Sequence, residues 1–166
     1  HQISLLHKTI TKRIVRKAAY VCPVSIELMT AMQEFGFAGT YRPIGNVVDT
    51  NTFYTNKDKE HEFTIIHISS LNDQQKNISG MLSAAKKLED KIGPFTWKFI
   101  GGTSKNYLDL LEKLAFKHAT IECIDHLSQE ALALHLQQAH ICVSFSNYET
   151  FGITVTEAIA SGTSVI

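Results

Sequence analysis

From residue 63 onward, short apolar runs alternate with longer segments in which apolar residues recur at helical spacing. The apolar runs have the length of β-strands and cover 63–68, 97–100, 120–124, 141–145 and 164–166. Helical periodicity follows each of the first four runs, and the connections are short. Strands and helices that alternate in this way fold as βαβ units. The pattern therefore predicts an α/β fold, a Rossmann-like parallel sheet with helices on both faces, whose ligands bind beyond the carboxyl ends of the strands.

Individual residues predict where several helices begin and end. Gly93 and Pro94 stop the periodic segment that begins at Ile78. Ser128 is placed to cap the helix after the third strand, and a further helix is predicted at 153–160.

The beginning of the chain has a different pattern. Ile3, Leu6, Ile10 and Ile14 recur at helical spacing, and the basic residues of this stretch precede the first acid, Glu27; they are Lys8, Lys12, Arg13, Arg16 and Lys17. A basic amphipathic helix of this kind could lie on a membrane or on an acidic partner. We favour the simpler interpretation, a solvated helix belonging to a larger body.

Two further segments precede the alternating region. A β-prone run at 20–24 is followed by Ser25, which is placed to cap a helix over 26–35. Residues 41–60 are rich in Asn, Asp, Thr and Gly and have no periodicity, which indicates an extended connector. We therefore predict three parts: 1–40, 41–60, and a Rossmann-like domain at 61–166.

Composition excludes several classes of protein. Lys plus Arg is 16 and Asp plus Glu is 16, so the formal charge is zero and nucleic acid is disfavoured as a partner. No apolar stretch is long enough to span a bilayer. Three cysteines without C-x-x-C spacing favour a reducing, cytoplasmic setting. Because the last strand has no helix after it to cover it, we expect the 166 residues to be a piece of a longer protein.

Two glutamates flank the turn after the fourth strand. Glu149 and Glu157 are separated by seven residues that include Phe151 and Gly152. Eight helical steps would span ~12 Å, more than the roughly 5–9.5 Å between the carboxyl groups of a glycosidase pair. The two carboxylates therefore suit opposite ends of an elongated ligand with hydroxyl groups, and the helix N-terminus between them suits an anion. Either glutamate taken alone could equally be a solvated surface residue.

Other candidates follow the remaining strands. Lys76 is expected near the start of the next helix, where it would either face an anion or be an exposed surface lysine. The segment 101–104 (Gly-Gly-Thr-Ser) is a weak phosphate-loop signal and favours a tight turn. Asp125 and His126 could border a ligand or lead into the Ser128 cap. His67 lies within an apolar strand and is interpreted as a hydrogen-bonded core residue.

Together these segments resemble the retaining GT-B glycosyltransferases of family 4, also called group 1. The segment 149–166 (ETFGITVTEAIASGTSVI) resembles the E-x7-E signature of that family and the small-residue turn after it. The segment 139–146 resembles the strand entering the signature, and 63–76 resembles the strand and loop that end in a phosphate-binding lysine. Asn46 to Asp49 with Phe53 resembles the connector between the two domains of the family, and 20–25 the last strand of its acceptor domain.

The resemblance implies a role for each site residue. Lys76 would neutralise the donor diphosphate, and Glu149 would hold hydroxyls of the transferred sugar. The amides of Phe151, Gly152, Ile153 and Thr154 would meet sugar and phosphate oxygens, Glu157 would bind the ribose, and the loop from Ile124 to His126 would face the base. Stabilisation of the leaving diphosphate by fixed charge requires no metal, so no cofactor is expected.

One departure from the family concerns the loop after the first strand. Many members of that family have Gly-Arg where this chain has Ser69 and Ser70. Ser70 can donate a hydrogen bond to the nucleotide sugar, but it brings no positive charge. The implied partners are a nucleotide-sugar donor and, through a domain that precedes this region, a glycan or lipid-linked acceptor. The parent protein is expected in the cytoplasm, with possible peripheral association at the inner face of the membrane, and this piece alone is expected to be inactive. Two alternatives remain: a GT-B-shaped sugar-nucleotide epimerase or phosphorylase, and a non-catalytic flavodoxin-like regulatory module.

Overall fold

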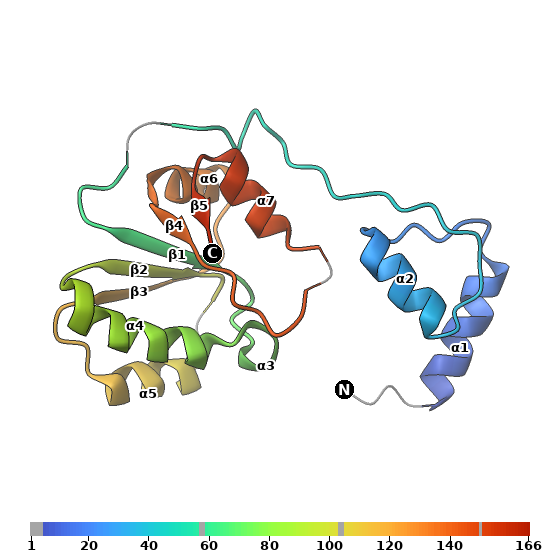
Figure 1. The fold of residues 1–166 in the computed structure, drawn as a ribbon, viewed down its shortest axis with the longest axis horizontal. Coiled ribbons are helices and arrows are strands. Elements are labelled where there is room, and N and C mark those ends of the chain that lie inside the picture. The colour runs from blue at the N-terminus through green and yellow to red at the C-terminus, as the bar shows by residue number, and fades with distance from the viewer. Residues whose placement is uncertain (1–4, 57–58, 103–104, 150) are drawn as a thin grey trace. The chain divides into compact units, whose positions relative to one another are not determined.

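The computed structural model describes residues 5–56, 59–102, 105–149 and 151–166 (Figure 1). By its internal contacts the chain divides into two compact units, His1–Val47 and Val48–Ile166, which we call unit 1 and unit 2. The division lies within the segment 41–60 that the sequence predicts as a connector. Lys57 and Asp58 of that segment, and Ile3 of the predicted basic helix, lie outside the described residues.

Unit 1 consists of two helices and the chain that follows them. Helix α1 spans Leu5–Lys17 and helix α2 spans Ile26–Glu34, one residue shorter than predicted. The side chain of Ser25 caps α2 as expected, because its hydroxyl accepts a hydrogen bond from the amide of Leu28 at 3.1 Å. The predicted β-prone run at 20–24 forms a single parallel bridge between Val21 and Tyr41. None of the described helices is long and apolar enough to cross a membrane.

Unit 2 is built on a parallel sheet of five strands in the order β3-β2-β1-β4-β5. The strands are β1 (Thr64–Ile68), β2 (Thr96–Ile100), β3 (Thr120–Ile124), β4 (Ile141–Cys142) and β5 (Ser164–Val165). The chain moves outward from β1 to β3 and then returns to place β4 on the other side of β1. The strand order therefore reverses between β1 and β4, which is where open α/β sheets bind their ligands.

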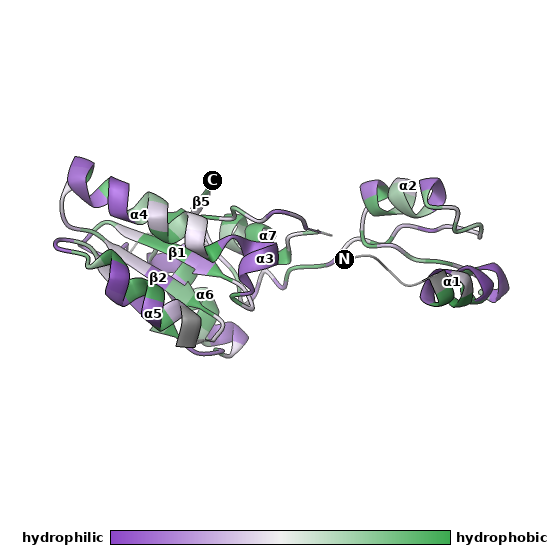
Figure 2. Ribbon diagram, turned by 90° about the horizontal axis from the view of Figure 1, so that it is seen from below, coloured by the Kyte–Doolittle hydropathy of each residue, from purple (hydrophilic) through white to green (hydrophobic). Residues whose placement is uncertain are grey.

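Helices cover both faces of this sheet, which confirms the predicted fold class (Figure 1). They are α3 (Asp73–Lys76), α4 (Ile78–Ile92), α5 (Lys105–Leu114), α6 (Gln129–Gln138) and α7 (Ile153–Ala160). Ile78, Met81 and Leu82 of α4 pack with Trp97 and Phe99 of β2 in one buried cluster. Ala133 and Leu136 of α6 and Ala158 of α7 pack on the opposite face with Ile66. Figure 2 shows apolar and hydrophilic residues side by side on α4 and α5, as expected of helices with one buried face.

The residues predicted to delimit the helices do so. Gly93 ends α4 with φ +78°, and the hydroxyl of Ser128 caps α6 by accepting a hydrogen bond from the amide of Ala131. Phe53, which is 2% exposed, anchors the segment before β1 in the same cluster as α6 and α7.

The fourth strand is shorter than its apolar pattern predicts. The run at 141–145 suggests five strand residues, but β4 ends at Cys142. The amides of Val143 and Ser144 still donate to the carbonyls of Ile66 and Ile166, both at 2.8 Å. The carbonyl of Val143 is bound by the imidazole of His67 at 2.8 Å, and Phe145 turns outward, with 64% of its surface exposed. The side chain of His67 thus replaces the next backbone hydrogen bond between β1 and β4, and the chain after Val143 leaves the sheet as a loop.

Strands β1 and β2 approach closely just beyond their carboxyl ends. The amide of Ser69 donates to the carbonyl of Ile100 at 2.9 Å, and Gly101 follows with φ +129°. A Cβ atom on Gly101 would lie 1.8 Å from the carbonyl oxygen of Ser69. Only glycine fits there, because any side chain would displace the loop that begins at Ser69.

Candidate functional site

Two predicted site residues from distant parts of the sequence meet at the switch point of the sheet. Lys76 is the last residue of α3, and Glu149 lies in the loop between β4 and α7. The Nζ of Lys76 donates to Oε1 of Glu149, and the hydroxyl of Ser146 donates to the same oxygen at 2.8 Å. Their side chains are 16% and 32% exposed, so the pair is partly shielded from water.

The position of Lys76 differs from the sequence prediction. The sequence predicts Lys76 near the start of a helix, where the helix dipole disfavours a cation. It lies instead at the carboxyl end of the short helix α3, where a positive charge is favourable, and α4 begins after Asn77. Asn77 has φ +52°, and this left-handed residue separates the two helices.

The environment affects the two glutamates in opposite directions. Burial alone would raise the pKa of Glu149, but the hydrogen bonds from Lys76 and Ser146 outweigh it and lower the pKa below its ordinary value. Burial raises the pKa of Glu157, whose carboxylate makes no hydrogen bond or ion pair with any described residue. Glu149 is therefore ionised and occupied, whereas Glu157 is half-buried and available to a ligand that donates hydrogen bonds.

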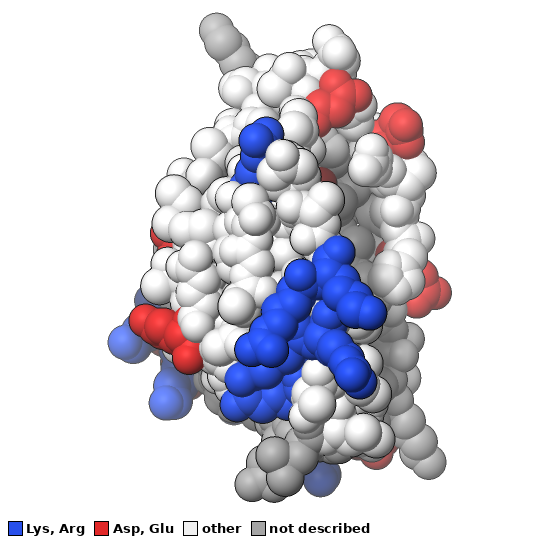
Figure 3. Space-filling view, turned by 90° about the vertical axis from the view of Figure 1, so that its right-hand side faces the viewer, with Lys and Arg blue, Asp and Glu red and all other residues white. Residues whose placement is uncertain are grey.

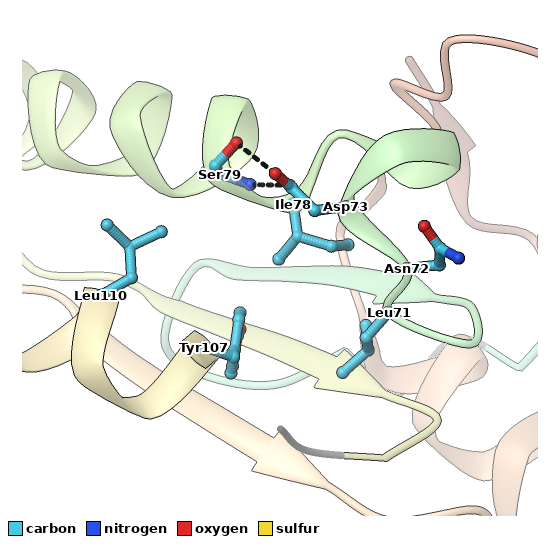
Figure 4. Close-up of a pocket in the computed structure, with 7 residues that line it drawn as sticks. All are labelled: Leu71, Asn72, Asp73, Ile78, Ser79, Tyr107 and Leu110. Atoms are coloured by element: carbon cyan, nitrogen blue, oxygen red, sulfur yellow. Dashed lines mark hydrogen bonds between the residues drawn. The ribbon is translucent and has the colours of Figure 1, made fainter. Parts of the chain in front are cut away.

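Helix α3 is held from two sides, which determines the position of Lys76. On one side Asp73 accepts hydrogen bonds from the amide and the hydroxyl of Ser79 in α4, at 2.7 and 2.9 Å (Figure 4). These residues border a cavity of about 360 Å³, which is also lined by Leu71 and Asn72 before α3, by Ile78 of α4, and by Tyr107 and Leu110 of α5. On the other side Asn147 donates from its backbone amide to the carbonyl of Gln75 at 2.7 Å and from its side chain to that of Gln74 at 2.9 Å.

The start of α7 follows the ion pair in the chain. Gly152 precedes the helix with φ +74°, and Phe151, Ile153 and Thr154 are partly exposed around it. The first amides of α7 have no partners within the helix, which suits an anion. Because α7 begins only at Ile153, Glu149 lies before the helix and Glu157 lies within it, so the ~12 Å expected for eight helical steps does not apply. Thr150 lies outside the described residues.

A smaller cavity lies at the carboxyl ends of β1, β2 and β3. Its volume is about 110 Å³, and its lining includes Ser69, Gly101 and His126. Ile124, the last residue of β3, packs in the core beneath this edge. The structure thus brings Ser69 to this cavity, whereas the predicted Ser70 is exposed beside it. Thr103 and Ser104 of the predicted tight turn lie outside the described residues.

Three residues important to this geometry had no predicted role there. Ser146 and Asn147 hold Glu149 and α3, and Ser69 accepts a hydrogen bond from the amide of Leu71 at 3.0 Å. The only sequence signal for them is their place, because all three are polar and lie just after an apolar run predicted as a strand. His67 is buried with both ring nitrogens hydrogen-bonded, as predicted for a core histidine.

Chemically, the arrangement offers a cation, a carboxylate and free helix amides along one edge of a sheet. This combination suits a ligand that carries both an anionic group and hydroxyl groups. Among the described residues, no group of three or more His, Cys, Asp or Glu side chains is placed to hold a metal ion.

Comparison with known proteins gives a family and a set of similar folds. The model of the family described as glycosyl transferases group 1 matches residues 49–166. Sucrose-phosphate synthase from Thermosynechococcus elongatus has a TM-score of 0.84 and 21% identity, over 99% of this chain and 44% of that chain. TarM of S. aureus has a TM-score of 0.79 and 18% identity, over 96% of this chain and 31% of that chain.

HepE from Anabaena is similar at a TM-score of 0.74 and 17% identity, over 98% of this chain and 48% of that chain. At such identities these likenesses establish the fold. The chain spans less than half the length of these three structures. No curated protein sequence matches the chain significantly.

Proposed function

Because this chain belongs to the glycosyl transferases group 1 family, we propose that unit 2 binds a nucleotide-sugar donor for a retaining sugar transfer. The full-length protein would be a GT-B enzyme of family 4 whose acceptor, a glycan or a lipid-linked sugar, binds mainly through another domain. The observation that carries this proposal is the meeting of Lys76 and Glu149 beside the start of α7, at the switch point of the sheet.

Each part of the donor has a chemical counterpart along this edge. Lys76 and the amides of α7 neutralise the diphosphate, and its negative charge increases as the glycosidic bond breaks. Glu149 accepts hydrogen bonds from hydroxyls of the sugar, and the half-buried Glu157 accepts them from the ribose. The base of the nucleotide lies next to the cavity beside His126 and Ile124. Ser70 donates a further hydrogen bond to the phosphates. No step in this assignment requires a metal ion.

The structural neighbours suggest which nucleotide to test first. The structures include HepE with UDP and glucose, TarM with UDP, and the pneumococcal GtfA with UDP and GlcNAc. Uridine diphosphate is therefore the first probe for this chain, and GDP and ADP follow.

Isothermal titration calorimetry of UDP on the 166-residue chain tests donor binding. A hydrogen bond to a charged group contributes about 1.5–3 kcal/mol, so Lys76→Ala should weaken the Kd roughly 10- to 100-fold. Glu157→Gln should weaken it by about 10-fold through the ribose. Lys87→Ala and Glu112→Gln change exposed residues of α4 and α5 and serve as matched controls that should leave the Kd unchanged. If UDP, GDP and ADP all produce no heat at millimolar concentration with folded protein, donor binding is refuted.

The ion pair provides a second, sharper test. Without a nucleotide sugar, the carboxylate of Glu149 is hydrogen-bonded to the ammonium group of Lys76, which the diphosphate needs. Glu149→Gln should therefore strengthen UDP binding, while it abolishes sugar transfer by the full-length enzyme. Nuclear magnetic resonance of the product anomer tests retention. Conversion of the donor sugar without any acceptor would instead favour an epimerase.

The regulatory-module alternative receives less support. A phospho-receiver requires an acidic cluster beyond its first strand, and the residues directly after β1 are Ser69 and Ser70. Binding of a nucleoside diphosphate that depends on Lys76 would exclude it.

We also propose peripheral membrane association through α1 of unit 1. Leu6, Ile10 and Ile14 form an apolar stripe on α1 that is 68%, 47% and 63% exposed, and the helix contains no acid. A patch of lysines and arginines is visible in Figure 3, and the basic residues of unit 1 are Lys8, Lys12, Arg13, Arg16, Lys17 and Arg42. Each basic residue near an anionic bilayer contributes about 1 kcal/mol.

Vesicle sedimentation tests this association. The chain should bind phosphatidylglycerol vesicles, bind phosphatidylcholine vesicles weakly, and dissociate at high salt. Ile10→Asp should abolish binding, and Thr30→Asp on the exposed side of α2 is the matched control. No binding to either lipid, or equal binding by Ile10→Asp and the unaltered chain, would favour the interpretation that α1 is a helix of a larger body.

A further inference from the structure

His67 connects the two loops that carry the ion pair. It is 2% exposed near the end of β1, and its Nδ1 lies 2.8 Å from the carbonyl oxygen of Val143, just beyond β4. Its Nε2 lies 2.8 Å from the hydroxyl of Ser69. A carbonyl can only accept a hydrogen bond, so Nδ1 must carry the proton and, in the neutral ring, Nε2 accepts from Ser69. This determines the tautomer of the imidazole.

On the β1 side, the hydrogen bond from Ser69 continues into the turn before α3. The hydroxyl of Ser69 also accepts the amide of Leu71 at 3.0 Å, and Leu71 has φ +52°. A left-handed conformation costs a non-glycine residue about 1–2 kcal/mol, so this turn needs a bond that holds it. The turn leads directly to Asn72, the N-cap of α3, and four residues later to Lys76.

On the β4 side, Val143 begins the loop that carries Ser146, Asn147 and Glu149. The hydrogen bonds of Asn147 to the carbonyls of Gln74 and Gln75 join this loop to α3 as well. The two loops are therefore connected at His67, at Asn147 and at the ion pair itself. His67 is the buried member of these three connections.

We propose that His67 is a positioning residue. It keeps the turn from Ser69 to Asn72, which leads to Lys76, and the loop from Val143 to Glu149 in the relative positions that binding of the nucleotide-sugar donor requires. The proposal rests on the proposed function of the site. An apolar residue at position 67 would fill the same space between the strands. It would leave the carbonyl of Val143 and the hydroxyl of Ser69 without their buried partner, and such groups then favour conformations that reach water.

The charges around the ring agree with a neutral, hydrogen-bonded role. Burial lowers the pKa of His67, the bond to Val143 opposes this, and the nearby charges of Lys76 and Glu149 act in opposite directions. The ring is thus neutral at pH 7. In acid, a proton on Nε2 would force the hydroxyl of Ser69 to turn its own proton away and would add a positive charge beside Lys76.

Amide hydrogen exchange, measured without ligand, tests the positioning directly. Leu71 and Asn147 provide one reporter amide in each loop, each with a hydrogen bond of its own. His67→Leu should accelerate exchange at both amides at least tenfold, and Ser69→Ala should accelerate Leu71 alone. His67→Asn, which can still donate to Val143, should restore protection at Asn147. The exposed His61→Asn and Ser83→Ala are the controls.

Calorimetry with UDP completes the test and separates the two hypotheses. We expect His67→Leu to weaken UDP binding about tenfold and His67→Asn to weaken it less. If exchange changes as expected but the unaltered chain binds no UDP, positioning stands and the proposed function fails. If the unaltered chain binds UDP and folded His67→Leu leaves the Kd and both amides unchanged, the positioning role is refuted. Should His67→Leu not fold, His67→Asn decides, because it keeps a donor for Val143 and removes the partner of the Ser69 hydroxyl. Unchanged exchange at Leu71 in that variant would also refute the role.

Discussion

Replacement of Gly101 by alanine should affect stability and the candidate site together. An added Cβ would lie 1.8 Å from the carbonyl oxygen of Ser69, and Cβ atoms essentially never approach closer than 3.0 Å, so the two groups must separate by at least 1.2 Å. The backbone at Gly101 also has φ +129°, a conformation that L-residues rarely adopt. Backbone strain and overpacking each cost about 1–3 kcal/mol, so Gly101→Ala should lower the free energy of unfolding by roughly 2–6 kcal/mol.

Gly93 provides the matched control. It also has a positive φ, +78°, but a Cβ built there meets nothing within 4 Å. Gly93→Ala should therefore cost only the backbone strain of its positive φ, about 1–3 kcal/mol. The difference between the two variants isolates the overlap with Ser69 and should be about 2 kcal/mol.

Urea unfolding of both variants measures that difference. With a slope of about 1–3 kcal/mol per molar urea, a difference of about 2 kcal/mol separates the two midpoints by roughly 1 M. Gly101→Ala should also weaken UDP binding, since Ser69 must move, whereas Gly93→Ala should not. If the free energies of unfolding of Gly101→Ala and Gly93→Ala lay within about 0.5 kcal/mol of each other, the ends of β1 and β2 could separate at little cost. That result would refute the reasoning.

Three further predictions concern buried groups in unit 2. Glu89 accepts hydrogen bonds from Lys86 and the amides of Lys117, His118 and Ala119, which lower its pKa to about 2. The contribution of the ionised Glu89 to stability is complete above about pH 4.5 and is lost as the pH falls toward 2. Glu89→Gln should therefore be less stable than the unaltered chain at pH 7 and should lose less stability on acidification. Thermal unfolding at a series of pH values measures both differences. Burial lowers the pKa of His67, so below pH 6.5 the unfolded chain takes up a proton that the folded chain refuses, and stability decreases. His67→Asn should therefore lose less stability than the unaltered chain between pH 7 and 5, and an equal loss would argue against a buried neutral ring. Phe53→Ala should cost roughly 3–5 kcal/mol in urea unfolding, while Tyr54→Ala, at a position 53% exposed, should cost about 0.5 kcal/mol or less.

Much of the fold could be predicted because its signals are local. Apolar runs and helical spacing depend on residues within a few positions of one another, and the caps at Ser25 and Ser128 depend on a single hydroxyl. The length of β4 could not be predicted in this way. Its apolar run continues to Phe145, but the strand ends where His67 takes the carbonyl of Val143, and these two residues are 76 positions apart.

The candidate site illustrates the same limit. Lys76 and Glu149 could be proposed separately, because each follows a strand and each matches a position of the family pattern. Their pairing depends on how Asp73 and Asn147 orient a helix of only four residues, and no periodicity encodes that orientation.

The pairing changes the electrostatic interpretation of the site. In the proposed function, Lys76 is the cation on which the diphosphate depends, because Ser69 and Ser70 stand where the family resemblance leads us to expect Gly-Arg, and Glu149 already pairs with that lysine. A donor must therefore displace a carboxylate from that lysine, and the displaced carboxylate is then free to accept the sugar hydroxyls. Binding of the diphosphate and capture of the sugar become one coupled step. A bare diphosphate offers no hydroxyls to Glu149 in return, so the sugar part of the donor should contribute more to affinity here than in a site with a second cation. The ratio of the UDP and UDP-sugar dissociation constants measures that contribution, and the ratio should decrease in Glu149→Gln.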